Sequence, residues 1–440
     1  MCLLHRVRSV GLTSAAVIAA LAPAARAQTV PVVTLSASTA TSADRFGAIL
    51  NVRELPGGRL LVDDGKNREV KLLSSSLTTE RIVLDSALES ANTYGNFPLA
   101  LIPYLADSTL FPSPNKARAV FVIDPNGNVA RTLAMPRASD VPLLRRAVSD
   151  DKGRIIFAAP AEVKRAPALG VPPLLLDSVP LLRADLATRR TDTIAFVVHP
   201  MLGVDTWNGR GQLTFWMPDA LKWIDDWAVL SDGSLALVRG HDYHVDWLRS
   251  DDSKSASPKL PFEWRQLTDA QKEGMIDSAQ HNWQVAAENN TLLQNAERPP
   301  TPWPRATLSG SSDPAAPTRP SFDTTKAVVT NAVLSGSIMA RLPNKPTVDQ
   351  VFDYYAPIRD RAAMADLDNQ LWVLPTISKE SKAGELVYDV VGSKGELVRR
   401  VRLPAGRYII GFGKGGVVYL AHGDLKNGFA VERATVVGAK

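Results

Sequence analysis

A glycine-rich stretch near the C-terminal end, IIGFGKGGVVYL, has the spacing of a phosphate-binding loop. Gly411, Gly413 and Gly416 match the pattern G-x-G-x-x-G, and Lys414 lies among them. A dinucleotide-binding loop of this kind opens a helix after a buried parallel strand. Here two strand-like segments follow instead, VVYLAHGD and FAVERATVV. We therefore interpret the glycines as the turn of a β-hairpin, with Lys414 at its exposed tip.

A second group with the chemistry of metal ligands is the run HDYH (241–244), which holds two histidines and an acid. The run lies between the strand-like segments LALVRG and VDWLRS, so it is predicted to form a hairpin turn. In such a turn His241 and His244 point apart, whereas a metal site needs three or more converging ligands. We predict a polar turn without a metal. The other histidines after residue 27 are isolated and are expected to be structural or solvated: His199, His281 and His422.

The first 27 residues have the three-part order of a secretory signal peptide. A basic stretch, MCLLHRVRSVGL, precedes an apolar stretch, TSAAVIAALAPA, and the small-x-small site Ala25-Arg26-Ala27. We expect the mature protein to begin near Gln28 and to be exported to the periplasm or the cell exterior. Because Cys2 is the only cysteine, the mature chain is expected to have no disulfide and no thiolate site.

Charge gives no sign of a nucleic-acid partner. The formal net charge of the whole chain is +5, and the predicted signal peptide carries three arginines and no acid. The mature chain is therefore close to balance, at about +2, and has no basic run that could follow a phosphate backbone. It also lacks an apolar run of about 18 residues, the length that spans a membrane. We expect a monomer that binds neither nucleic acid nor the membrane interior.

The elements that must position any site are short strands in repeated pairs. Most copies of the repeat are followed by a second strand pair, which predicts four-stranded antiparallel blades of a propeller. The repeated turn stretches are LPGGRLLVDD (55–64), IPYLADSTLFP (102–112), SDDKGRIIFAA (149–159), LSDGSLALVRG (230–240), ADLDNQLWVLP (365–375) and GFGKGGVVYLA (411–421). The six predicted units are 46–84, 97–136, 143–198, 223–262, 357–404 and 405–437.

Two segments complete the predicted six-bladed β-propeller over residues 28–440. The last unit has only three evident strands, and we expect VPVVTLSAS (30–38) to supply the fourth and close the ring. Residues 263–346 break the repeat as a polar, proline-rich insertion between the fourth and fifth blades. A capping box, Thr268 and Gln271, begins a helix predicted over 268–297 that lies across one face of the ring. Its apolar face is predicted from the spacing of Met275, Ile276, Ala279, Trp283 and Ala286.

Five longer stretches carry a family resemblance: FGAILNVRELPGGRLLVDD, YHVDWLRSDD, LPFEWRQLTDAQKEGMIDSA, ADLDNQLWV and VRRVRLPAGRYIIGFGKGGVVYL. They resemble the exported six-bladed β-propeller proteins of bacteria that are related to the NHL-repeat group, over most of residues 44–437. The shared motif is an Asp-x-x-Gly turn before an apolar-aromatic strand, with Asn369 in place of glycine in one copy. The resemblance implies the architecture but no catalytic residues, because propellers host binding, scaffolding and several chemistries.

The innermost strand of each blade lines the central channel, so its side chains determine what the channel binds. Arginine suits an anionic ligand or a structural ion pair, whereas a lactonase-type hydrolase needs Glu, Asp and Asn around a divalent cation such as calcium. We predict a non-enzymatic exported propeller, without a cofactor, that binds a ligand or a protein partner. The alternative is a metal-dependent hydrolase of the propeller lactonase type. The predicted inner strands offer Asn51, Arg53, Arg145, Arg146, Asp226, Arg361 and Tyr408.

Aromatic stretches precede two inner strands, in FWMPDALKWIDDW and VFDYYAPI. They suit either a binding rim at the channel mouth or packing between blades, and the insertion helix suits a lid or a docking element. The candidate ligand-binding residues of the channel and this rim are Arg53, Arg145, Asp226, Trp227, Tyr354 and Arg361.

Overall fold

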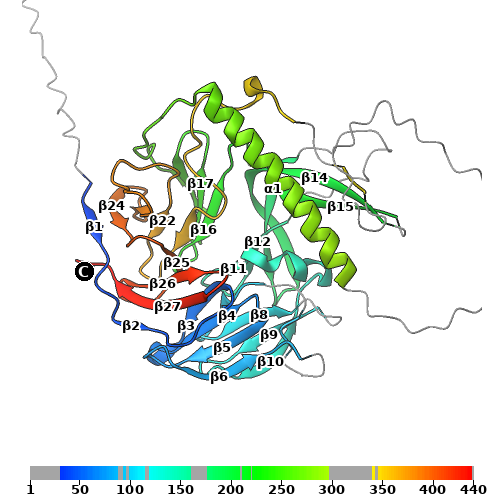
Figure 1. The fold of residues 1–440 in the computed structure, drawn as a ribbon. Coiled ribbons are helices and arrows are strands. Elements are labelled where there is room, and N and C mark those ends of the chain that lie inside the picture. The colour runs from blue at the N-terminus through cyan, green and yellow to red at the C-terminus, as the bar shows by residue number, and fades with distance from the viewer. Residues whose placement is uncertain are drawn as a thin grey trace, which may run out of the picture.

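The structure is a computed structural model that describes residues 30–87, 93–95, 99–113, 118–159, 176–208, 211–219, 221–296, 339–341 and 345–438. The predicted signal peptide and most of the proline-rich part of the insertion lie outside these residues. Within them the chain forms six sheets arranged as a ring (Figure 1). The predicted six-bladed β-propeller with a helical insertion between the fourth and fifth blades is confirmed.

Each blade begins with an inner strand and grows outward by antiparallel pairing. Blade 1 is β3 (Ile49–Glu54), β4 (Leu60–Asp64), β5 (Glu69–Leu73) and β6 (Thr79–Leu84). Blade 2 is β7 (Ile102–Pro103), β8 (Thr109–Ser113), β9 (Ala119–Ile123) and β10 (Val129–Ala134). Blade 3 is β11 (Val148–Ser149), β12 (Ile155–Ala158), β13 (Leu176–Asp185), β14 (Arg190–Asn208) and β15 (Gly211–Pro218), with β20 (Met339–Arg341) paired to β14.

The second half of the ring follows the same plan. Blade 4 is β16 (Asp226–Val229), β17 (Leu235–Arg239), β18 (His244–Leu248) and β19 (Lys254–Ala256). Blade 5 is β21 (Ala363–Ala365), β22 (Leu371–Val373), β23 (Val387–Val391) and β24 (Leu397–Arg402), and blade 6 is β25 (Arg407–Phe412), β26 (Val417–Asp424) and β27 (Gly428–Thr435). The helical elements are α1 (Asp269–Ala296) and the 3₁₀ turns η1 (Pro56–Gly58), η2 (Ala138–Arg146) and η3 (Val348–Gln350).

The first turn of every blade makes the same hydrogen bond, from one backbone N–H to the carbonyl four residues later. These turns coincide with the six turn stretches predicted from the sequence, so the repeat was located correctly. The donor of this bond directly follows the inner strand in every blade. It therefore serves as a common reference point for comparing positions in the six inner strands. The six donors are Leu55, Tyr104, Asp150, Leu230, Asp366 and Gly413.

Neighbouring inner strands are joined at equivalent positions, counted from this donor. The Asn51 side chain accepts a hydrogen bond from the Leu101 N–H of blade 2 at 3.3 Å. The Asp226 carboxylate accepts one from the Ala363 N–H of blade 5 at 2.8 Å. Asn51 and Asp226 both lie four residues before their turn donors. These two bonds fix the register of the inner strands between blades 1 and 2 and between blades 4 and 5.

The middle strands are buried along their whole length because adjacent blades cover both of their faces, as in β4 and β23. Both strands nevertheless contain an acid, and each acid bonds to a tyrosine of a neighbouring blade or connection. The Tyr94 O–H donates to Asp63 in β4, and the Tyr243 O–H of blade 4 donates to Asp389 in β23 at 2.8 Å. These bonds supply the partner that a buried polar group requires.

The N-terminal segment closes the ring differently from the prediction. Strand β1 (Val32–Thr34) pairs in parallel with β24 on the outer edge of blade 5. Only the following residues reach blade 6, where Leu35 bridges to Val436 and β2 (Ala40–Thr41) pairs antiparallel with β27. The predicted segment 30–38 is thus divided between two blades. Both outer edges gain a hydrogen-bonded neighbour, which one strand confined to blade 6 would not provide.

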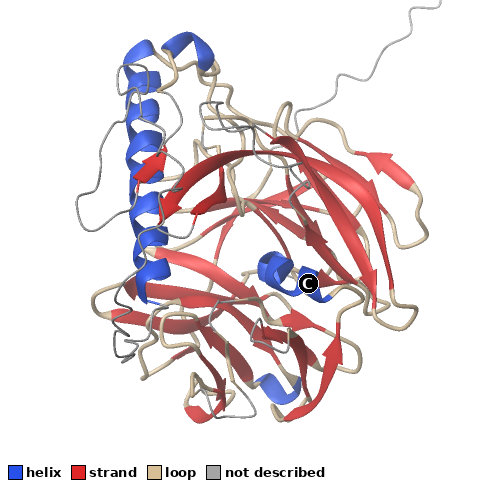
Figure 2. Cartoon of the chain, turned by 90° about the vertical axis from the view of Figure 1, so that its right-hand side faces the viewer, coloured by secondary structure: helices blue, strands red, loops and turns tan. Residues whose placement is uncertain are grey.

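Two further features extend beyond the predicted repeat. Blade 3 was predicted to end at residue 198, but β14 continues to Asn208 and returns as β15. Helix α1 begins with the predicted capping box between Thr268 and Gln271 and lies along one side of the ring (Figure 2). It packs against Leu221 and Val351, which lead into the inner strands of blades 4 and 5. The buried residues of its apolar face are Ile276, Ala279 and Trp283.

We predict that Asp63 makes the fold less stable as the pH rises. Burial, reinforced by Asp64 and opposed by the Tyr94 hydrogen bond, raises the pKa of the Asp63 carboxyl to about 8. The unfolded chain releases this proton near pH 4, so the folded chain holds the extra proton between about pH 4 and pH 8 and loses stability across that window. Asp63→Asn, which is neutral throughout, should reduce this loss in urea unfolding.

The matched control is Asp44→Asn, at an exposed position. It should leave the slope of the unfolding free energy against pH close to that of the parent. If Asp63→Asn also follows the parent slope, Asp63 does not remain protonated in the folded protein.

Candidate ligand-binding channel

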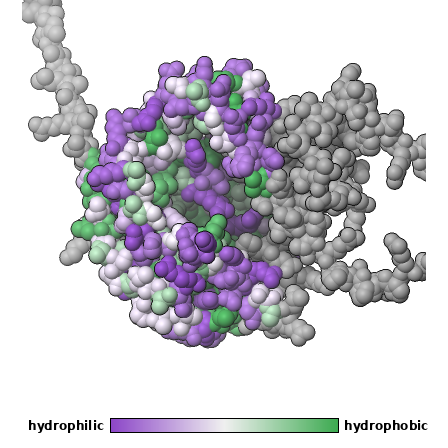
Figure 3. Space-filling model, viewed as in Figure 1, coloured by the Kyte–Doolittle hydropathy of each residue, from purple (hydrophilic) through white to green (hydrophobic). Residues whose placement is uncertain are grey.

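The central channel is a cavity of about 570 Å³ whose wall includes residues of all six blades. This volume lies within the range of small-molecule sites. Figure 3 shows the hollow at the middle of the ring, with hydrophilic and hydrophobic residues on its wall. Helix α1 lies on the same face of the ring, where it packs against residues that lead into the inner strands. We call the opening at the start of the inner strands the channel mouth.

Two arginines line the channel mouth without strong partners. Arg145 and Arg361 both line the cavity, and each lies five residues before its turn donor, ahead of the inner strands β11 and β21. Arg145 is exposed and forms no hydrogen bond or ion pair within the described part of the chain. Arg361 is 66% exposed, and among the described residues its ion-pair partner is Asp360, at 3.8 Å. Its backbone has φ of 64°, a left-handed conformation that costs a non-glycine residue about 1 kcal/mol.

The next arginine along the chain has a different role. Arg146 forms ion pairs with Asp226 at 2.7 Å and with Asp360 at 3.0 Å, and its guanidinium lies 6.0 Å from the Trp227 ring centre. Burial alone would lower the pKa of Arg146, but the two carboxylates outweigh it and raise that pKa. His199, predicted to be isolated, lies 3.4 Å from Asp360. Arg146 is therefore a structural cation that neutralises the acids beneath the channel mouth.

A third unpaired arginine lies further into the channel. Arg53 is two residues before its turn donor, near the end of β3. Its Nε atom is buried and has no hydrogen-bond partner among the described residues. Burial lowers the pKa of Arg53, while Asp107 and Glu54 oppose this effect. The channel thus has cationic groups at two levels.

The structure brings together most of the predicted ligand-binding residues, but not all. Arg53, Arg145, Trp227 and Arg361 line the cavity. Asp226 is buried beneath the wall and bonded to Arg146 and blade 5, so it is not free to contact a ligand. Asp360 was not predicted from the sequence, although this residue directly precedes Arg361. Aligning the residues just ahead of each inner strand could have found it.

Tyr354 lies outside the channel, in an aromatic cluster beside the start of α1. Its ring is 6.5 Å from that of Trp264, and residue 354 forms a backbone bridge to Gln266. In the same cluster Trp223 stacks on Phe352 at 4.4 Å. Trp264, Phe352 and Tyr354 are exposed, so this cluster forms a partly solvent-facing aromatic surface near the insertion and does not line the channel.

No group of three or more His, Cys, Asp or Glu side chains within the described ranges could hold a metal ion. In the HDYH run, His244 bonds to Asp242 at 2.5 Å and to Asp246 at 3.1 Å. His241 instead meets the Trp223 ring edge-on at 4.7 Å. The two histidines contact different partners, as predicted for a hairpin turn.

The glycine-rich stretch forms the predicted hairpin turn between β25 and β26. Gly415 and Gly416 have φ of 70° and 74°, and their N–H groups point at the Asp368 carboxylate, at 3.2 and 2.6 Å. The turn is therefore an anion-binding loop whose anion is a side chain of blade 5. This bond is another contact between adjacent blades, not a nucleotide site.

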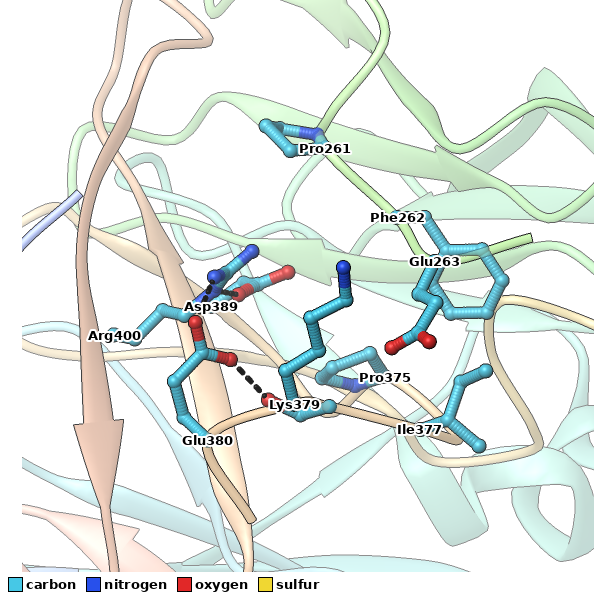
Figure 4. A pocket seen from close by; sticks show the side chains of 10 residues that line it. Pro261, Phe262, Glu263, Pro375, Ile377, Lys379, Glu380, Asp389 and Arg400 are labelled. Atoms are coloured by element: carbon cyan, nitrogen blue, oxygen red, sulfur yellow. Dashed lines mark hydrogen bonds and ion pairs between the residues drawn. The ribbon is translucent and has the colours of Figure 1, made fainter. Parts of the chain in front are cut away.

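A second cavity, of about 280 Å³, lies between blades 4 and 5 (Figure 4). Its charged groups are largely paired with one another. Arg400 bonds to Asp389 at 2.8 Å and to Glu380 at 2.7 Å, and the Ser378 hydroxyl also donates to Glu380. The second cavity has one cation without a partner among the described residues, the exposed Lys379. The channel is lined by residues of all six blades and has three arginines with little or no pairing among the described residues, so it is the stronger candidate site.

The fold and the channel define a six-bladed β-propeller. No protein-family model and no curated protein sequence matches the chain. Among solved structures it is similar to a gluconolactonase from Xanthomonas campestris, with 10% identity and a TM-score of 0.37, covering 89% of this chain and 87% of that one. It is also similar to the calcium-binding protein regucalcin from Agrobacterium tumefaciens, with 10% identity, a TM-score of 0.38, and coverage of 93% and 97%. Likeness this distant says nothing about activity.

We predict that the same substitution affects stability strongly at Arg146 and hardly at all at its neighbour Arg145. Arg146→Gln leaves the buried Asp226 carboxylate without its cation, which should lower the free energy of unfolding by about 3 kcal/mol. Arg145→Gln removes an exposed, unpaired side chain and should change it by less than about 0.5 kcal/mol. Urea unfolding of both variants measures the difference. Equal effects would show that Arg146 does not stabilise the junction of blades 3, 4 and 5.

Proposed function

We propose that this chain is an exported, non-enzymatic β-propeller that binds an anionic organic ligand at the channel mouth. The observation that carries the proposal is the pair Arg145 and Arg361, which line the cavity with little neutralisation from described residues. A guanidinium in this position can bind a carboxylate or phosphate through two parallel N–H bonds. Export rests on the signal peptide predicted for residues 1–27.

The distribution of charged side chains around the channel supports this proposal. The acids nearest the channel mouth, Asp226 and Asp360, are bonded to Arg146, which leaves them less able to hold a cation. Among the described residues Arg145 has no acid partner, and Arg361 meets, at 3.8 Å, only the Asp360 carboxylate that Arg146 already binds. An anionic group would therefore supply the charge that these arginines lack, while the apolar wall below them can accommodate its organic part. No helix in the described part of the chain is long and apolar enough to cross a membrane.

We expect octanoate to bind the purified mature protein and to raise its melting temperature further as its concentration increases, because it binds only the folded state. Octylamine, with the same chain and the opposite charge, should not. The double variant Arg145→Gln/Arg361→Gln should lose at least about tenfold in octanoate affinity by calorimetry. The control Arg131→Gln, on the exposed outer strand β10, should bind as the parent does.

Two results would contradict the proposal. One is a double variant that binds octanoate as tightly as the parent. The other is stoichiometric metal in the purified protein together with turnover of a lactone or ester that chelation abolishes, which would support the hydrolase instead.

A further inference from the structure

We propose that the channel ligand is elongated, with an acidic group at each end and an apolar body between them. This inference rests on the proposed function and adds Arg53 as the second anchoring residue. It predicts a ligand class, an amphipathic dianion such as an α,ω-dicarboxylate, rather than a simple anion.

The distance between the two cationic levels follows from the common reference point of the blades. Arg145 and Arg361 lie five residues before their turn donors, whereas Arg53 lies two residues before its own. Arg53 lies in the extended strand β3, whereas Arg145 lies in the 3₁₀ turn η2 and Arg361 has a left-handed backbone ahead of β21. Because such segments advance less per residue than a strand does, the three-residue offset corresponds to at most about 10 Å along the channel.

Arg53 is available to a ligand at this depth. It lines the cavity, forms no hydrogen bond or ion pair in the described ranges, and keeps a buried Nε donor without an acceptor. Its neighbour Glu54 already accepts the Tyr419 O–H at 2.6 Å, and Asp107 is exposed to water. A partly buried cation with so little compensation gains from a bound carboxylate.

The wall between the two cationic levels suits an apolar chain. Two positions lie between the levels, counting from the turn donors. The fourth residue before the donor is polar in blades 1, 3 and 4, but these side chains, Asn51, Arg146 and Asp226, already bond to other residues. The third residue before the donor is apolar in every blade. The wall residues at this position are Val52, Leu101, Ala147, Trp227, Ala363 and Ile410. A short dicarboxylate would reach one end only, and a highly charged polymer would place its central charges against this apolar ring.

Suberate and octanoate test the inference because they have equally long carbon chains and differ in the second carboxylate. By calorimetry, suberate should bind the parent at least about tenfold more tightly than octanoate, and succinate should show no such gain. Arg53→Gln should remove the preference for suberate, so that suberate and octanoate bind this variant with similar affinity. Asp107→Asn, which removes a competing carboxylate at a position that asparagine tolerates, should increase the preference.

The outcomes separate this inference from the proposed function. If suberate binds the parent no more tightly than octanoate, or if Arg53→Gln keeps the preference, the two-ended ligand is wrong while the channel-mouth site stands. If Arg145→Gln/Arg361→Gln binds octanoate as the parent does, the proposed function fails. Should Arg53→Gln unfold, Asp107→Asn still decides, because an unchanged preference there contradicts a role for Arg53.

Discussion

Side chains that bond across blade boundaries hold the inner strands in step, and the geometry of the channel depends on them. Asn51 joins blades 1 and 2, and Asp226 joins blades 4 and 5. A slip of one residue in any inner strand would turn its side chains to the opposite face. It would then move Arg145 or Arg361 relative to the rest of the channel wall. The positions of charges in the channel therefore depend on bonds that lie behind its wall.

The same boundaries separate paired charges from unpaired ones. Acids placed between blades bond to a tyrosine, an arginine or a glycine turn, as Asp389, Asp226 and Asp368 do. Asp389 and Asp226 are buried and must find partners because they have lost water, whereas Asp368 is exposed. Arginines at the channel surface retain access to water and need none, so Arg145 can stay unpaired at little cost. Structural ion pairing and ligand binding are thus assigned to adjacent residues, Arg145 and Arg146.

Local chemistry allowed much of this fold to be predicted from the sequence. Turn residues and short apolar runs located six turns, six blades and the α1 capping box, because each depends on neighbours in the chain. Predictions that depended on distant partners were less accurate. The pairing of Arg146 with Asp360 joins residues 214 apart, and residues 30–38 gave no sign that they would divide between two blades. Tyr354 was placed at the channel because its distance from the axis is not encoded locally.

The pairing of the N-terminal segment with blade 6 also constrains how the propeller can fold. Ser36 bonds to Thr435, a separation of 399 residues, and β2 pairs with the last strand, β27. Earlier blades are built from hairpins and can form from a partial chain, but blade 6 lacks its outer strand until both ends are present. Contacts between residues so far apart in the sequence are slow to form. In the meantime the unpaired strand edges can pair with wrong partners. Ring closure is therefore a late step, and the time before it is when this chain is most exposed to misassembly.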